Sequence, residues 1–247
     1  MIDFHVHQPA LLDGELPYSA AEYRAYTDSL GISLSVIFTL DGLRSPGPAA
    51  NDALAAYVER DRDAFVAFAT VNPHDPGAAD EIVRCVRTHG MRGVKLHPWV
   101  QGFSPHAPGL DPICDVAGTL GLPVLLHDGT PPWSTPLQIA VLARRHPRTT
   151  IVLGHGGLHD LWREARTAVE LAPNLQICLC ATPAYAMRAL IASCPLDRLL
   201  FGTDGGLQPE PRQRYVALRV RQLDLLGLSD RSRRAILEGN PRRLLAA

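Results

Sequence analysis

Short apolar runs alternate with amphipathic segments along the whole chain. Most of these runs, such as VLLH at 124–127 and TIVLGH at 150–155, lack a strict alternation of apolar and polar residues, which is typical of parallel strands buried on both faces. The runs predict eight strands at intervals of roughly 24 to 33 residues, a spacing that fits strand–helix units around a parallel sheet. The expected strands begin at Ile2, Ile32, Phe65, Gly93, Pro123, Thr150, Leu175 and Leu199.

The segments between these runs have apolar residues at steps of three and four, which indicates helices. Ser19 and Glu22 form a capping-box pattern, Gly90 follows the expected end of a helix, and Ser229 can cap a helix near the C-terminus. No shift in composition divides the chain. Eight strand–helix units in 247 residues therefore predict an α/β protein that forms a single (β/α)8 (TIM) barrel domain over residues 1–247. A doubly wound open sheet is the alternative.

Composition and charge exclude several classes of partner. The formal net charge is −1, so the chain lacks the basic footprint of a nucleic-acid-binding or membrane-surface protein. No apolar run approaches the length of a membrane span and no signal peptide is visible, so we expect a cytoplasmic location and no membrane partner. Five cysteines without a C-x-x-C motif, among them Cys178 and Cys180, are interpreted as reduced core residues. The expected partner is a small-molecule substrate, and the sequence leaves open whether the chain forms a homo-oligomer.

Side chains that can bind a metal follow five of the expected strands. The first strand ends in DFHVH, where two histidines at i and i+2 would point to one face. Later strands end in VKLH, VLLHD, VLGHGG and FGTDGG, and in a barrel the carboxyl ends of strands ring one mouth, where active sites are built. Imidazoles and carboxylates that converge there predict a site for a divalent metal. The candidate ligands are His5, His7, Lys95, His127, His155 and Asp204.

The order of these motifs resembles the amidohydrolase superfamily, and in particular its amidohydrolase-related branch (amidohydrolase 2, similar to ACMSD). The likeness rests on the opening MIDFHVH, on FATVNPHDP, GVKLHP, VLGHGG and LFGTD, and on the closing GNPRRLL. The resemblance implies a TIM barrel with its active site at the carboxyl ends of the strands. It also implies a divalent metal, most often zinc, although His/Asp sites also accept other transition metals.

Two arrangements of metal are open within this resemblance. In a single-metal site, the ligands would be His5, His7, His127 and Asp204, and His155 would act as acid or base beside the metal. In a two-metal site, Lys95 would carry a carbamate that bridges the ions, and His127 and His155 would hold the second ion. The resemblance does not decide between one ion and two.

Lys95 is the only lysine in the chain, which otherwise uses arginine at 23 positions. A buried lysine can lose its proton and form a carbamate, whereas arginine stays protonated. The alternatives are that Lys95 is a plain cation, paired with Asp204 or with a substrate carboxylate, or that it is incidental.

The resemblance implies a metal-dependent hydrolase that cleaves an amide, ester or lactone bond of a small molecule with a metal-activated water. Asp204 would carry the proton of the water to the leaving group, and His155 would steady the oxyanion or relay a proton. The alternative is a metal-dependent non-oxidative decarboxylase of a small aromatic or enoic carboxylic acid. Such relatives tend to be longer than 247 residues, which favours hydrolysis. A barrel that keeps its metal without catalysis is a third hypothesis.

Several residues near the expected mouth are candidates for contact with the substrate. His97 shares a strand face with the lysine two positions before it, and Trp99 and Trp133 also follow strand ends. All three are predicted to bind substrate. The segment 99–112 reads as a long loop after the fourth strand, and it is a candidate lid.

Overall fold

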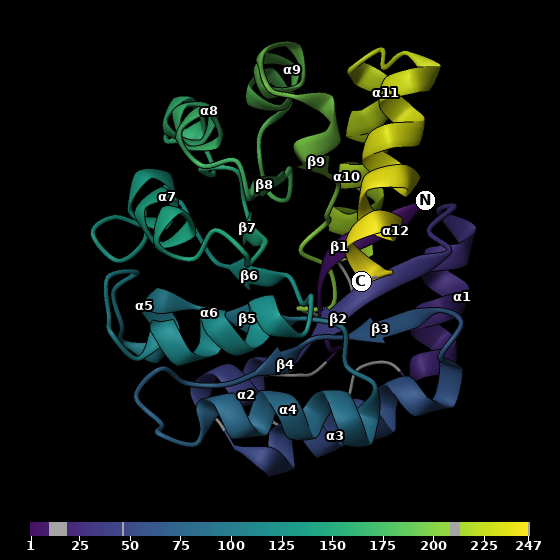
Figure 1. The fold of residues 1–247 in the computed structure, drawn as a ribbon. Coiled ribbons are helices and arrows are strands. Elements are labelled where there is room, and N and C mark those ends of the chain that lie inside the picture. Colours follow the sequence, from purple (N-terminus) through teal and green to yellow (C-terminus); the bar gives the residue numbers. More distant parts are fainter. Residues whose placement is uncertain (10–18, 46, 208–212, 247) are drawn as a thin grey trace.

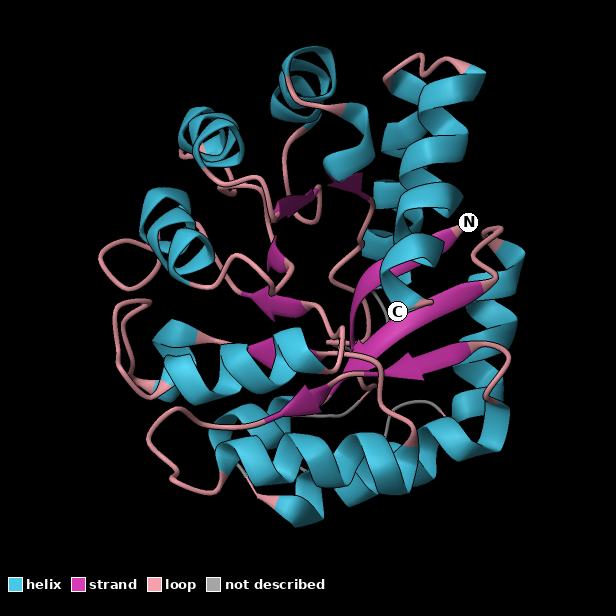
Figure 2. Ribbon diagram, in the orientation of Figure 1, coloured by secondary structure: helices cyan, strands magenta, loops and turns pink. Residues whose placement is uncertain are grey.

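In the computed structural model of the chain, which describes residues 1–9, 19–45, 47–207 and 213–246, parallel strands lie at the centre and helices surround them (Figures 1 and 2). One sheet has the order β1-β2-β3 and the other has the order β4-β5-β6-β7-β8-β9, so neighbours in sequence are neighbours in space. The strands are β1 (Ile2–His7), β2 (Leu34–Phe38), β3 (Phe65–Ala67), β4 (Ala69–Thr70), β5 (Val94–Leu96), β6 (Val124–Leu126), β7 (Ile151–Leu153), β8 (Leu175–Cys178) and β9 (Leu199–Leu200).

The two sheets are joined at both of their edges. Phe68 alone separates β3 from β4, so these two strands form one interrupted strand. At the other seam, β1 bonds to the chain that follows β9: the amide of His7 donates to the carbonyl oxygen of Gly205, and the amide of Asp204 donates to that of His5, both at 2.9 Å. The predicted (β/α)8 barrel with parallel strands is confirmed, and every expected strand is present within two residues of its expected start.

Helices follow the strands and cover the outside of the barrel. The Ser19 capping box, the Ser229 cap and the left-handed Gly90 (φ 67°) at a helix end are all present, as expected. The helices are α1 (Ala20–Ser29), α2 (Leu40–Arg44), α3 (Pro48–Val58), α4 (Ala78–His89), α5 (Pro98–Gln101), α6 (Leu110–Thr119), α7 (Pro136–Arg145), α8 (Trp162–Leu171), α9 (Ala184–Ser193), α10 (Gln213–Leu225), α11 (Asp230–Arg234) and α12 (Asn240–Leu245), with a π-helical segment at Ala235–Gly239.

The segment 99–112 differs from the expected long loop. It contains most of α5 and the first residues of α6, and the chain between these helices is anchored by the buried side chain of Phe103. The side-chain amide of Gln101 donates to the carbonyl oxygen of Val71 at 2.7 Å, and its oxygen accepts from the amide of His97 at 2.7 Å. These contacts tie the segment to the end of β5, so a lid that swings freely is not what this segment forms.

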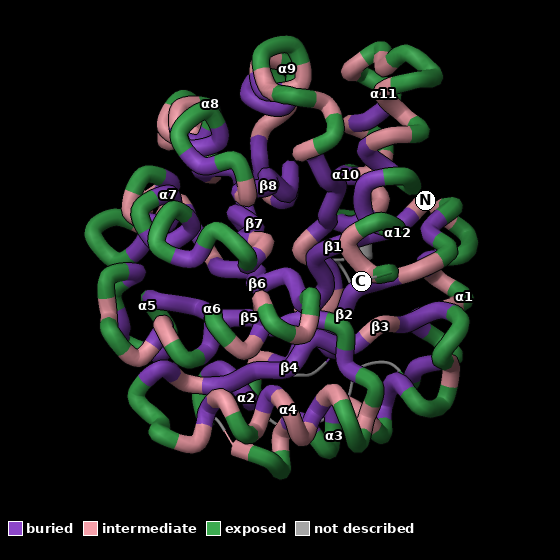
Figure 3. The backbone as a smooth tube through the Cα atoms, viewed as in Figure 1, coloured by how far each residue is buried: buried purple, intermediate pink, exposed green. Residues whose placement is uncertain are grey.

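Strand residues alternate between two cores. Val94 and Leu96 belong to the large cluster that also contains the buried faces of the outer helices. Lys95 lies between them and pairs in register with Leu125, which in turn pairs with Val152, and these two residues belong to a separate cluster inside the ring of strands. Since successive strand residues point to opposite sides, the register directs the Lys95 side chain into the barrel. The tube in Figure 3 shows the same arrangement, with buried strands at the centre and exposed residues on the outer helices.

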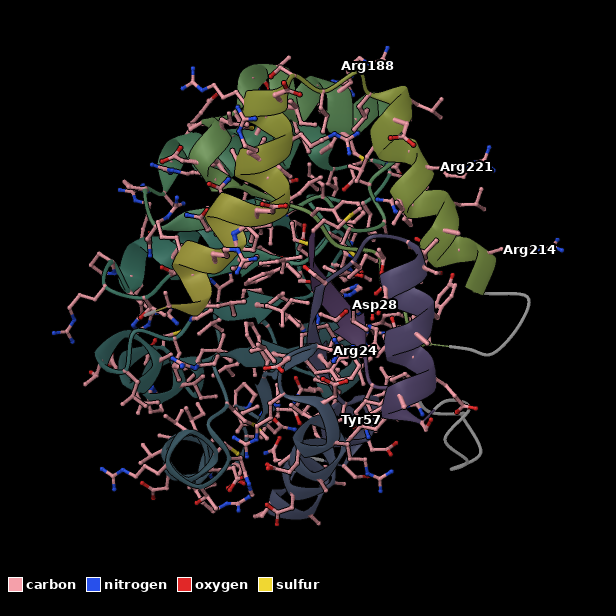
Figure 4. All side chains as sticks on the ribbon, turned by 90° about the vertical axis from the view of Figure 1, so that its right-hand side faces the viewer. Arg24, Asp28, Tyr57, Arg188, Arg214 and Arg221 are labelled. Carbon is pink, nitrogen blue, oxygen red and sulfur yellow. The ribbon has the colours of Figure 1, made fainter. Side chains whose placement is uncertain are left out.

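Charged side chains lie on the outer faces of the helices. Arg24 and Asp28 of α1 form an ion pair at 3.2 Å, and Arg188, Arg214 and Arg221 are exposed. In Figure 4 the side chains of Arg214 and Arg221 point outward from α10. These arginines therefore lie on solvated helix faces. Within the described ranges, no helix combines the length and the apolar character needed to cross a bilayer.

Candidate metal centre

The imidazoles of His5 and His7 lie on β1 and are buried, with exposed fractions of 0% and 5%. His5 Nδ1 lies 3.0 Å from the carbonyl oxygen of Gly154, which can only accept, so Nδ1 carries the proton and Nε2 is left with a lone pair. Two glycines make room for this ring. A Cβ on Gly154 would lie 3.1 Å from His5 Cε1, and a Cβ on Gly202 would lie 2.7 Å from His5 Cβ.

The carboxylate of Asp204 faces both of these histidines. Its Oδ1 lies 3.4 Å from Nε2 of His5 and 3.2 Å from Nε2 of His7. Asp204 has a φ of 65°, a left-handed conformation that aspartate tolerates better than most residues, and its side chain is 21% exposed. The unusual backbone turns the carboxylate toward the mouth, where a substrate can reach it.

A second carboxylate fixes the backbone beneath this pair. Asp3 is fully buried, and its Oδ1 accepts from the amide of His5 at 3.2 Å and from the amide of Thr203 at 2.9 Å. Its Oδ2 accepts from the Thr203 hydroxyl at 2.5 Å. Asp3 therefore holds β1 against the chain that carries Asp204. The candidate ligands His5 and Asp204 lie on the same two segments that Asp3 joins.

Lys95 is fully buried at the bottom of the site. Its Nζ lies 3.4 Å from Nε2 of His5 and 4.6 Å from the centroid of the Phe38 ring. Lys95 forms no salt bridge within the described ranges, so the expected alternative of a direct pair with Asp204 is not what this structure has. Burial lowers the pKa of the Lys95 amine to about 8, although the negative charge of Asp204 acts in the opposite direction. The amine is thus easier to deprotonate than an exposed lysine.

His155 lies just beyond β7, and its ring centroid is 4.6 Å from that of His5. Asp128, fully buried, accepts from the amides of His155 and Gly157, each at 2.6 Å, and so holds the turn that carries the imidazole. The contact of Asp128 with the His155 backbone was not predicted from the sequence. Two short charge-assisted bonds to one turn leave His155 little freedom to move.

His127 and His97 form a stacked pair beside His155. Their ring centroids are 3.8 Å apart with an interplanar angle of 12°, and the His127 ring lies 4.4 Å from that of His155. His127 Nε2 is hydrogen-bonded to the hydroxyl of Thr130 at 2.8 Å, on its own loop. His127 thus reaches the group through His155, and its predicted role as a ligand stays a prediction.

The two tryptophans predicted to bind substrate follow strand ends, Trp99 in the short helix α5 and Trp133 in a turn after β6. Trp99 is 55% exposed, and its ring centroid is 6.0 Å from that of His97. Trp133 is 41% exposed and lies in a turn closed by the pairing of Thr130 with Ser134. Exposed aromatic rings beside a polar mouth can contact a flat substrate, and this role of both residues stays a prediction.

Cys180 is a member of the site that was not expected. His5, His155, Cys180 and Asp204 each place one donor atom within 4.8 Å of all the others, and His7 joins this group through Asp204. Cys180 follows the end of β8 and its side chain is buried. The i, i+2 spacing from Cys178 suggested a core residue, and nothing in the local sequence indicates that its neighbours come from three other strands.

The protonation of the group suits a divalent cation. Burial lowers the pKa of every histidine in it, that of His155 to about 4, so the imidazoles are neutral near pH 7. Burial opposes ionisation of Asp204, but the hydrogen bond with His7 and the proximity of His155 and Lys95 outweigh it and hold the pKa of this carboxyl below its usual range. Among the residues that the structure describes, Nδ1 of His7 and Nδ1 of His155 are buried without a hydrogen-bond partner, which is costly in an apolar interior. Neutral imidazoles with unused nitrogens around one carboxylate are a donor set that fits a divalent metal.

Comparison with known proteins identifies the family. The family model described as Amidohydrolase (Amidohydro_2) matches residues 2–246. A gamma-resorcylate decarboxylase of Rhizobium radiobacter is 32% identical over 163 residues, which are 51% of this chain and 50% of that protein, so the chain spans about half the length of the curated relatives it matches.

Solved structures share the fold. A 2,6-dihydroxybenzoate decarboxylase from Rhizobium has a TM-score of 0.74 at 21% identity, over 99% of this chain and 98% of that one. A probable 2-pyrone-4,6-dicarboxylic acid hydrolase from Acinetobacter baumannii has a TM-score of 0.72 at 16% identity, over 100% of this chain and 99% of that one. With a family match that spans nearly every residue, the chain belongs to the amidohydrolase 2 family of enzymes.

Proposed function

We propose that this chain is a metal-dependent enzyme that removes CO2 from a small hydroxylated aromatic carboxylic acid. The observation that carries the proposal is the charge of the mouth: one ionised carboxylate, Asp204, stands among neutral imidazoles with the buried amine of Lys95 behind them. A bound divalent cation would make this mouth positive, which favours an anionic substrate. The gamma-resorcylate decarboxylase matched at 32% identity supports the same reaction class.

The chain's own residues suggest how the metal and the substrate would be held. His5, His155 and Asp204 would hold the cation, with His7 as a ligand or as the partner that fixes Asp204. When bound, the cation would act as a Lewis acid toward the oxygens of the substrate. The exposed rings of Trp99 and Trp133 would flank the aromatic part, and the stacked pair of His97 and His127 would border it.

Asp204 is the residue best placed to carry a proton. It is the partly exposed carboxylate of the group, and it is ionised near pH 7, so it can take a proton from solvent or from a ring hydroxyl. Decarboxylation breaks the bond between the ring carbon and the carboxyl carbon and leaves the electron pair on the ring carbon. Asp204 then gives its proton to that carbon as CO2 departs, a general-acid role that contributes typically about 10²–10⁴-fold.

Hydrolysis of an ester, lactone or amide is the second candidate, and the Asp204–His7 hydrogen bond at 3.2 Å favours it. A carboxylate fixed by an imidazole can take a proton from water as readily as from a hydroxyl group. A short chain does not exclude decarboxylation, because the structural match covers 98% of a decarboxylase chain. A structural neighbour described as a probable hydrolase also supports hydrolysis as the second candidate.

A paired assay tests the proposal. The zinc- and manganese-loaded proteins are incubated with 2,6-dihydroxybenzoate and related acids, and separately with a panel of lactones, esters and amides. CO2 release and water-dependent cleavage are measured in parallel. We expect CO2 release that falls by about 10²-fold or more in Asp204→Asn. The control is Asp160→Asn, an exposed carboxylate on the loop after β7, which should change neither rate. Cleavage of the panel without CO2 release from any acid would replace decarboxylation by hydrolysis.

A further inference from the structure

Cys180 occupies a position in the metal centre that neither reaction explains. Its buried sulfur lies within 4.8 Å of the donor atoms of His5, His155 and Asp204, which belong to three other segments of the barrel. Nδ1 of His155, also buried, has no hydrogen-bond partner within the described residues. The thiol is thus a neighbour of an imidazole whose Nδ1 has no partner among these residues.

The backbone on both sides of Cys180 is held by a buried arginine. Arg219 of α10 donates to the carbonyl oxygens of Leu179 and Thr182, each at 2.8 Å. The Thr182 hydroxyl donates to the carbonyl oxygen of His155 at 2.9 Å, which links the Cys180 segment to the turn that carries the imidazole. A buried guanidinium is costly unless it is well paired, and here its pairing fixes a short loop around one cysteine. The backbone that carries the sulfur is therefore held by hydrogen bonds on both sides of Cys180.

We propose that Cys180 is a thiolate ligand of the metal in this site, together with His5, His155 and Asp204. The inference rests on the proposed metal-dependent function and adds the class of metal. On binding, the S–H bond breaks, the proton leaves to solvent, and the sulfur lone pair forms the bond to the cation, with no change of oxidation state. A donor set of imidazole, carboxylate and thiolate favours Zn²⁺ or Co²⁺ over Mg²⁺ and Ca²⁺, which prefer oxygen ligands alone.

Cys178 supplies the comparison that separates a ligand from a core residue. It is also fully buried, lies two positions earlier at the end of β8, and belongs to the same inner cluster, but it is not a member of the donor group. If both cysteines only filled space, their replacement by serine would have similar effects on metal binding. A ligand role predicts that only Cys180 matters for the metal.

The test uses cobalt as the probe, because a thiolate bound to Co²⁺ gives a sulfur-to-metal charge-transfer band in the near ultraviolet. We expect the band in the native protein and in Cys178→Ser, and its loss in Cys180→Ser with zinc affinity reduced by about 100-fold or more. X-ray absorption of the zinc-loaded native protein needs no variant, and it should show one sulfur at about 2.3 Å.

The outcomes separate this inference from the proposed function. Tight binding of cobalt without the band, and zinc absorption without a sulfur neighbour, would overturn the thiolate ligand and leave metal-dependent catalysis intact. Binding of neither cobalt nor zinc by the native protein would overturn both. An equal loss of the band in Cys178→Ser and Cys180→Ser would show a packing effect, and would also count against the ligand role.

Discussion

Gly202→Ala tests whether the inner wall of the barrel sets the position of His5. The added Cβ would lie 2.7 Å from the sulfur of Cys178, 2.7 Å from Cβ of His5 and 3.1 Å from Cβ of Cys180. Non-bonded carbon atoms approach favourably only to about 3.5–4.0 Å, so each neighbour would have to move by up to about 1 Å. All three belong to strands or their ends, and two of them are Cβ atoms, which move only with the backbone.

Overpacking of this kind costs about 1–3 kcal/mol. For a chain of this size, each kcal/mol corresponds to about 2–4 °C in Tm, so we expect a fall of roughly 2–12 °C. The effect on catalysis should be larger, because a displacement of about 1 Å at a reacting group can cost about 10²-fold.

The assay compares Tm by calorimetry, zinc affinity by competition with a chelating dye, and kcat/KM on the best substrate. The control is Gly239→Ala, where the nearest atom to the new Cβ would be the carbonyl oxygen of Arg234 at 3.6 Å, an ordinary contact. Unchanged zinc affinity and kcat/KM in Gly202→Ala would refute the idea that this glycine positions the His5 imidazole.

Three further predictions concern the charge and the metal of the site. Lys95→Arg should lower kcat/KM by about 10-fold or more, because the larger and permanently charged guanidinium does not fit the fully buried position; full activity in steady-state assays would show that no specific amine is needed. Removal of the divalent cation with a chelator should abolish activity, and its return at about 100 times Kd should restore about 2.7 kcal/mol of stability, visible as a recovered Tm in calorimetry; an unchanged Tm would contradict it. In the metal-free protein, denaturant titrations should show the free energy of unfolding falling as the pH drops from about 6.5 toward 4. The pKa of His155 is about 4 when folded and about 6.5 when unfolded, so the unfolded chain takes up a proton that the folded chain does not, a difference of roughly 3 kcal/mol. The raised pKa values of Asp3 and Asp128, about 7 and about 6, oppose this trend, but five histidines with lowered pKa values outnumber them. A free energy of unfolding that rises on acidification would contradict the prediction.

The strands could be predicted from the sequence because a parallel strand buried on both faces is a continuous apolar run between polar turns. The break between β3 and β4 could not. Phe68 interrupts the ladder, and its ring fills the space over Gly93, where a Cβ would lie 2.5 Å from the ring. At this point the chain changes partner strand, since the amide of Phe68 donates to the carbonyl oxygen of Ile37 and that of Ala69 to the carbonyl oxygen of Gly93, and the local pattern does not reveal this change.

In the site, too, the neighbours of some residues could be predicted from the sequence and those of others could not. His5 and Asp204 could be predicted as neighbours because both follow the geometry of strand ends, and their oxygen and nitrogen atoms lie 3.4 Å apart. The direction of His127 could not, because it depends on a hydrogen bond to Thr130 within its own loop. Cys180 could not be predicted either, because Cys178 and Cys180 both lie in the inner cluster while Leu179 lies in the outer one, a pattern that core cysteines would share.

The seam between β1 and the chain after β9 joins residues from opposite ends of the sequence: the amide of Thr203 donates to Asp3 at 2.9 Å, and that of Asp204 donates to the carbonyl oxygen of His5 at 2.9 Å. Contacts between such distant segments form late in folding, because the entropy of closing a long loop must be offset first. A nascent chain on the ribosome therefore presents both histidines of its first strand long before their carboxylate partner is synthesised. Catalysis should begin only once the segment that carries Asp204 has been synthesised, and a single protease cut that releases this segment from β1 would be expected to silence the enzyme.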